Sequence, residues 1–225
     1  RNLFGASLVA DRVAARAIEA IRACGATIVE DANIETTDEL WAFTTDALHY
    51  ELKASLNAYL ASLGPSAPVK NLEELIAFNI THSDSELAWF GQDTFESAQT
   101  RGPLTSPGYK NALSLMQQLA RNQGIDATLA KHQCDALVSP TQSPAWLIDV
   151  LLGDNTPLGG FVASAAAGYP AISVPAGDVA GLPVGLLFMG PAWSDAKLLN
   201  YAYAFEQKVR ARRAPNFLPS ISVRP

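Results

Sequence analysis

The sequence predicts an α/β fold in which a mixed β-sheet is covered by helices. Three patterns support this class. A helix, a glycine and a short β-prone run follow one another near the N-terminus. A buried-looking strand ends at Pro140, and a β-hairpin precedes an amphipathic helix near the C-terminus. Helices that alternate with strands and pack on a sheet are typical of α/β proteins.

The N-terminal part predicts one helix and one strand. Residues 8–24 carry apolar side chains at helical spacing, with arginine and glutamate on the opposite face. Gly25 follows at a position where helices commonly end. The β-prone run at 26–29 then predicts a short strand, which completes a helix–glycine–strand unit.

The central part predicts helices. One covers about 38–62, because a Thr-Asp pair at its start can cap it and a Gly-Pro pair closes it. A second is predicted over 71–80, and a third over 106–132 with an irregularity near Gly124. Because no Pro/Gly/Ser-rich spacer surrounds these helices, we expect no domain boundary here.

The C-terminal part predicts the sheet and its last helices. A strand at 135–139 is followed by a loop over 140–158 and by a helix of small residues over 159–168. Strands at 171–175 and 183–189 are separated by a turn over 177–181, which suits a hairpin. The last predicted helix is amphipathic and covers 194–213.

Composition excludes several classes of protein. The chain has 225 residues, 48% of them hydrophobic, so it can bury a sizeable core. Its net charge of -6 argues against nucleic acid as a partner, which needs a basic face. No apolar run reaches the roughly 20 residues of a membrane helix, so no membrane partner is expected. The two cysteines suggest no disulfide framework, and the three histidines lack a partner at metal-ligand spacing.

The loop at 139–155 is the best candidate for substrate contact. It follows a strand directly, and ligand sites of α/β sheets gather at the carboxyl ends of strands. Thr141 and Ser143 offer short polar groups, Trp146 a flat apolar wall, and Asp149 a negative charge. Such a mixture can orient an amide in an apolar cleft. The alternative, a surface loop whose Asp and Asn residues close turns, is equally compatible with the spacing.

A second candidate is Gln92, which follows Trp89, Phe90 and Gly91 and looks exposed between aromatic and acidic residues. The favoured interpretation of this segment is a corner between helices that the aromatic side chains fill. We nevertheless include Gln92 among the predicted substrate-binding residues, as a polar residue of the cleft.

Four blocks in this order resemble the amidase signature family. They are the strand and Pro-Thr turn at 135–141, the Gly-x-Pro-x-x-x-x-Pro-x-Gly segment at 168–177, the Gly-Leu-Pro-Val-Gly segment at 181–185, and the helix from Asp195 to Gln207. Within that family, Trp89 to Gln92 and the loop after Ser143 look most like bacterial peptide-amidase-like members. The resemblance implies the C-terminal part of an amidase signature fold.

The resemblance also implies a reaction, and it places the catalytic residues outside this chain. Family members cleave amides with a nucleophilic serine that lies in a Gly/Ser-rich block and with a cis-serine and a lysine upstream of it, and they use no metal or organic cofactor. No such block stands here, since Gly159-Gly160 is followed by Phe161. We therefore assign no catalytic residue to this chain. We expect residues 1–225 to be the C-terminal portion of a single amidase domain, inactive without its absent N-terminal catalytic portion.

The expected partners follow from the same resemblance. They are a small-molecule or peptide amide substrate, the missing N-terminal portion of the enzyme, and a second copy in a homo-oligomer. A partial chain should expose apolar surface that the missing portion would cover. The compartment stays open between the cytoplasm and, if a signal peptide lies upstream, the periplasm or exterior. The alternative is a non-catalytic module, derived from an amidase, that binds a ligand or partner.

Overall fold

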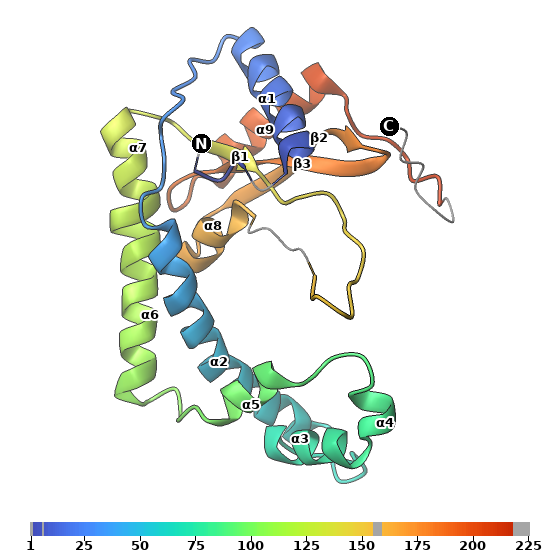
Figure 1. Ribbon diagram of the computed structural model, residues 1–225. Coiled ribbons are helices and arrows are strands. Elements are labelled where there is room, and N and C mark those ends of the chain that lie inside the picture. The colour runs from blue at the N-terminus through green and yellow to red at the C-terminus, as the bar shows by residue number, and fades with distance from the viewer. Residues whose placement is uncertain (1, 6, 155–158, 218–225) are drawn as a thin grey trace. The chain divides into compact units, whose positions relative to one another are not determined.

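The computed structural model describes residues 2–5, 7–154 and 159–217 (Figure 1). Its contacts divide the chain into two compact units. The first comprises the described residues within Arg1–Thr37, Gln118–Asp149 and Gly153–Pro225, and the second comprises Asp38–Gln117 with Val150–Leu152. Two of the divisions fall at the start of α2 (Thr37–Ser62) and inside α6 (Pro107–Ala120), and the other two fall in the loop around residues 149–153. That all of the chain belongs to a single amidase domain stays a prediction.

A three-stranded antiparallel sheet is the centre of the first unit in the part of the chain that the structure describes. Its strands are β1 (Leu137–Pro140), β2 (Ala171–Val179) and β3 (Leu182–Met189), in the order β1-β3-β2. The α/β class is confirmed, although these pairings include none of the parallel ones that a mixed sheet requires. β1 begins two residues later than predicted and includes Pro140. Proline can lie in an edge strand because the N–H that it lacks is not needed for pairing on the open side of the sheet.

The hairpin of β2 and β3 has a tighter turn than predicted. β2 continues through a bulge at Pro175–Gly177, so only Ala180 and Gly181 connect the strands. Their φ angles of +52° and +82° are both positive, as a type I′ turn requires. The Asp178 carboxylate accepts the Gly181 N–H at 3.0 Å and helps to close the turn.

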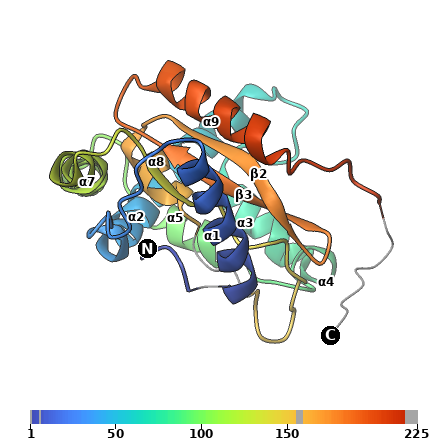
Figure 2. The same cartoon turned by 90° about the horizontal axis from the view of Figure 1, so that it is seen from above.

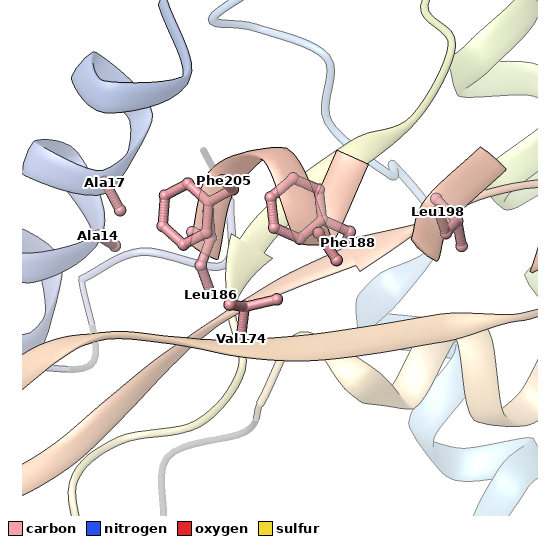
Figure 3. Packing of buried hydrophobic residues seen from close by; sticks show 8 residues of the cluster. Ala14, Ala17, Val174, Leu186, Phe188, Leu198 and Phe205 are labelled. Carbon is pink, nitrogen blue, oxygen red and sulfur yellow. The ribbon is translucent and has the colours of Figure 1, made fainter. Parts of the chain in front are cut away.

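Two amphipathic helices, α1 (Leu8–Ala23) and α9 (Asp195–Val209), pack against one face of this sheet. Seen from above, both run over the β2–β3 hairpin (Figure 2). Figure 3 shows the core between them, in which the rings of Phe188 and Phe205 lie with their centroids 5.6 Å apart. α9 ends at Val209, four residues earlier than predicted, because Arg210 takes a left-handed φ of +48°.

The predicted strand at 26–29 is wrong. Residues 26–29 follow α1 and Gly25 but form no strand, and Val29 is exposed. β-propensity describes how well a side chain fits a pleated, half-buried surface. A run of β-prone residues therefore becomes a strand only where a neighbouring strand supplies the hydrogen bonds, and none pairs with 26–29 among the described residues.

The predicted irregular helix is confirmed as three consecutive pieces. α6 (Pro107–Ala120) leads into a π-helical turn, η1 (Arg121–Ile125), and then into α7 (Asp126–His132). Gly124 lies inside the π-turn, where an added Cβ would come within 2.4 Å of the Leu119 carbonyl oxygen. α8 (Phe161–Ala167) is the predicted small-residue helix and precedes β2.

The second unit is helical. α2 (Thr37–Ser62) and α3 (Leu72–Thr81) match the predicted helices, and α3 begins where Asn71 Oδ1 accepts the Glu74 N–H at 2.9 Å. Two short helices, α4 (Ser83–Glu86) and α5 (Asp93–Gln99), were not predicted. None of the helices in the described ranges combines the length and the apolar character that a bilayer crossing needs.

Candidate functional site

Thr141, the first residue after β1, extends the sheet beyond the strand. Its backbone N–H donates to the Gly185 carbonyl of β3 at 2.9 Å. Its hydroxyl Oγ1 lies 2.7 Å from the Ser173 Oγ of β2, within hydrogen-bond distance. Two hydroxyls from opposite sides of β3 therefore meet over the central strand.

Gly185 makes this meeting possible. A Cβ on Gly185 would lie 2.4 Å from Ser173 Oγ and 2.9 Å from Thr141 Oγ1, closer than real contacts allow. The missing side chain leaves space for the two hydroxyls, so the glycine of the Gly-Leu-Pro-Val-Gly segment shapes the surface at the end of β1.

Ser139 lies on the same face as Thr141, two residues earlier on β1, and is 3% exposed. Side chains two apart on a strand point to the same face of the sheet. The Ser139 Oγ is buried and has no hydrogen-bond partner among the described residues. We call Ser139, Thr141 and Ser173 the hydroxyl cluster. Buried hydroxyls without a partner are uncommon, and each calls for an explanation such as a ligand or a bound water.

The start of α8 lies against the hydroxyl cluster. A Cβ on Gly160 would lie 1.9 Å from Ser139 Oγ, and a Cβ on Gly159 would lie 2.4 Å from the Thr141 carbonyl oxygen. The Gly160 N–H also donates to the Pro140 carbonyl at 3.3 Å. Two consecutive glycines thus bring the α8 backbone into contact with the end of β1.

Ser143 follows in the loop, and its Oγ is buried without a hydrogen-bond partner among the described residues. Trp146 is 42% exposed, so part of this large residue is open to solvent. This residue can therefore serve as the apolar wall that the sequence predicts, although nothing in the structure tests that role.

Asp154 organises the loop that carries Trp146. Its Oδ2 accepts the Trp146 Nε1–H at 3.2 Å, and its Oδ1 accepts the Asp149 backbone N–H at 2.9 Å. The Gly153 N–H in turn donates to the Asp149 carbonyl at 3.0 Å. The loop is therefore closed on itself by one carboxylate. The remainder of the predicted 140–158 loop, residues 155–158, lies outside the described residues.

Gln92 belongs to the second unit, whereas the other four predicted site residues belong to the first. Its side chain is half-buried, so the expectation of an exposed glutamine is wrong. Its Oε1 accepts from Asn79 Nδ2 at 3.0 Å and its Nε2 donates to the Ile76 carbonyl at 3.4 Å. The amide therefore joins α3 to the segment before α5. The aromatic residues before it do not fill a corner, because Trp89 and Phe90 are mostly exposed.

The site contains groups for hydrogen bonding and apolar contact. Within the described ranges, no three histidine, cysteine, aspartate or glutamate side chains gather in a way that could hold a metal ion. The described part of the site thus offers hydroxyls, a backbone turn and an indole, which suit recognition of a neutral polar group such as an amide.

Sequence reasoning missed the close backbone approaches at Gly159, Gly160 and Gly185, and it missed the hydrogen bonds of Asp154 to Trp146 and Asp149. Gly185 carried a signal, because a glycine inside a strand often marks a close approach of another group. The pairing of Thr141 with Ser173 carried none, since 32 residues separate them.

Comparison with known proteins shows the family of this chain. The model of the amidase family matches residues 2–199. A solved complex of the peptide amidase PAM with the competitive inhibitor chymostatin is 43% identical, with a TM-score of 0.84 over 92% of this chain and 42% of that one. The native peptide amidase of Stenotrophomonas maltophilia is 42% identical, with a TM-score of 0.80 over 92% and 41% of the two chains.

A curated relative gives the same result. A "Probable amidase" of Arabidopsis thaliana is 34% identical over 209 residues, which cover 89% of this chain and 37% of the plant protein. The chain thus spans roughly two fifths of the length of these relatives. The resemblance to the amidase signature family and to its peptide-amidase-like members is confirmed. This chain belongs to the amidase family.

Proposed function

We propose that this chain is the C-terminal portion of an enzyme that hydrolyses carboxylic or peptide amides, and that it supplies sheet and one wall of the substrate cleft. The similarity to peptide amidases, at 42–43% identity over 92% of the chain, carries the reaction class. The catalytic serine, cis-serine and lysine then belong to the remaining part of the enzyme, which this chain does not contain. The serine would attack the amide carbonyl, and the cis-serine and lysine would relay its proton to the leaving amine.

The hydroxyl cluster carries the assignment of the cleft wall. An amide substrate offers one carbonyl acceptor and N–H donors, and a hydroxyl can serve as either donor or acceptor. Thr141 Oγ1 and Ser173 Oγ lie 2.7 Å apart at an exposed position, and each hydroxyl can also form a hydrogen bond with a bound amide. Such a bond contributes about 0.5–1.5 kcal/mol when both partners were solvated before binding.

Trp146 adds apolar contact beside these polar groups, and Asp154 holds its indole in place. We propose Thr141, Ser143, Trp146 and Asp149 as substrate-binding residues. Gln92 stays in the proposal with a supporting role, because both ends of its amide are engaged within the second unit.

The exposed apolar side chains support the view that another part of the enzyme covers this chain. Leu147 and Ile148 are 84% and 81% exposed, and Leu151 and Leu152 are exposed even further. Monomeric proteins rarely expose contiguous apolar patches of more than a few hundred Å². A homo-oligomer is the second way in which such a segment becomes covered.

The test compares this chain alone with the enzyme made from the complete reading frame, on an amidated peptide and on simple carboxylic amides. We expect the complete enzyme to release ammonia and this chain to show no turnover. Serine-dependent hydrolysis by this chain alone would refute the proposal. Binding of amides without hydrolysis by the complete protein would favour the alternative, a non-catalytic binding module.

A further inference from the structure

The π-turn η1 brings two charged residues to the same side of one long helix. The Asp126 N–H donates to the Arg121 carbonyl, a bond that spans five residues in place of the usual four. In a regular α-helix, residues five apart point about 140° away from each other around the axis. The wider π-turn stacks them instead, so Arg121 and Asp126 reach the same neighbour.

That neighbour is Tyr169, in the connection between α8 and β2. The Arg121 guanidinium lies 5.8 Å from the centroid of the Tyr169 ring, within the range of a cation–π contact. The Tyr169 hydroxyl donates to Asp126 Oδ2 at 2.8 Å. Burial, and then the hydrogen bond to Asp126, raise the pKa of Tyr169, so the phenol keeps its proton and remains a donor.

Arg121 also holds the end of α8. Its Nε–H donates to the carbonyl of Ala167, the last residue of that helix, at 2.7 Å. The last carbonyls of a helix have no partner within the helix, so an arginine there satisfies a group that would otherwise be unpaired. Ala167 is fully buried and Arg121 is half-buried, so this bond is partly shielded from water.

The opposite end of α8 is in contact with the hydroxyl cluster through Gly159 and Gly160. α8 has seven residues and is about 10 Å long. A displacement at its C-terminal end is carried to its glycine end, because a helical backbone moves as one body over this length. The position of the hydroxyl cluster therefore depends on the contacts at Arg121.

We propose that Arg121, Tyr169 and Asp126 form a positioning network that holds α8 against the hydroxyl cluster and so sets the shape of the substrate cleft. The inference rests on the proposed amidase function. None of the three side chains contacts the hydroxyl cluster in the described hydrogen bonds, so each acts through α8. They are positioning residues for substrate binding.

The test uses Arg121→Ala, Arg121→Lys and the control Arg16→Ala in the complete enzyme, with an amidated peptide as substrate. Arg16 lies exposed on α1, so its removal changes the charge equally without touching α8. A misplacement of about 1 Å costs on the order of 10²-fold in rate when it affects the site. We expect Arg121→Ala to raise KM at least tenfold. Arg121→Lys should have a KM close to that of the unmodified enzyme, and Arg16→Ala should leave KM unchanged.

A purely structural role gives a different result. Unfolding lowers the number of active molecules, so apparent kcat falls while KM stays constant. Unchanged KM in Arg121→Ala, with hydrolysis intact in the unmodified enzyme, would overturn this inference and leave the proposed function standing. No hydrolysis by the unmodified enzyme would overturn both. If Arg121→Ala does not fold, Tyr169→Phe decides, since it removes one oxygen: a higher KM supports the network and an unchanged KM refutes it.

Discussion

Gly185→Ala is the sharpest probe of the surface at the end of β1. The new methyl group would lie 2.4 Å from Ser173 Oγ and 2.9 Å from Thr141 Oγ1, so at least one hydroxyl must move away. The two hydroxyls are 2.7 Å apart now, and the substitution would separate them. The perturbation is confined to one carbon atom in the middle of a strand.

The expected change in the free energy of unfolding combines three effects. Loss of the hydrogen bond between the hydroxyls costs about 0.5–1.5 kcal/mol. Overpacking of a filled space costs about 1–3 kcal/mol. Alanine is favoured over glycine in a strand interior by about 0.5–1 kcal/mol, which offsets part of the loss. We therefore expect Gly185→Ala to lower the free energy of unfolding by about 0.5–4 kcal/mol.

A double-mutant cycle tests the cause of that cost. Ser173→Ala removes the oxygen that the new methyl group would meet, so the double variant should lose less stability than the sum of the two single variants, by about 1–2 kcal/mol. The assay is urea unfolding of the complete enzyme followed by circular dichroism. Gly102→Ala is the matched control, because its Cβ would meet only ordinary contacts at 3.6 Å and beyond. That control should change stability little.

Two results would refute this reasoning. An unchanged urea midpoint in Gly185→Ala would show that the space over β3 is larger than the structure has it. Strictly additive losses in the double variant would show that Ser173 Oγ is not the atom in the way.

Three further predictions concern the core, the loop and the response to pH. Phe205→Ala should lower the free energy of unfolding by about 3–5 kcal/mol. Tyr203→Ala on the same helix, where the residue is 65% exposed, should leave the urea midpoint nearly unchanged. Equal losses of stability in the two variants would contradict the packing in Figure 3. Trp146→Ala and Asp154→Ala should both raise KM for an amidated peptide, since the carboxylate holds the indole; unchanged kinetics in both would remove this loop from the substrate site. Burial and the hydrogen bond to Asp126 raise the pKa of Tyr169 above 10.0. The protonated phenol therefore stabilises the fold below pH 10.0, and this stabilisation is lost as the pH rises through the raised pKa. Tyr169→Phe should therefore flatten the fall of the unfolding midpoint above pH 10.0, and an equally steep fall would show that Tyr169 does not contribute.

Local patterns predicted most of the helices correctly. Asn71 caps α3 as its spacing indicates, and the glycine at 124 marks the place where the long helix becomes irregular. Caps, apolar spacing and helix-breaking residues act over a few positions, so they can be recognised in the chain alone. The short helices α4 and α5 were missed because four to seven residues carry too little periodicity.

The proposed substrate-binding residues could be predicted only in part. The loop after β1 was identified because it follows a strand, and the structure confirms its position directly after β1. The availability of each side chain depended on its neighbours: the Gln92 amide is engaged within its own unit, while the Ser143 hydroxyl is left buried without a partner among the described residues.

The amino-acid sequence alone determines the family, the α/β class and the order of most elements. These features depend on short-range spacing and on motifs that are continuous in the chain. Only the tertiary structure decided that 26–29 does not become a strand, that Thr141 meets Ser173 over the bare backbone of Gly185, and that a π-turn aims Arg121 at the end of α8. Each of these depends on partners from 32 to 46 residues away, or on a neighbouring strand that must be present, and such pairings leave no periodic trace in the sequence. The four motif blocks between 135 and 207 therefore indicate the amidase family, while the surface proposed to meet a substrate exists only once β1, β2, β3 and α8 are brought together.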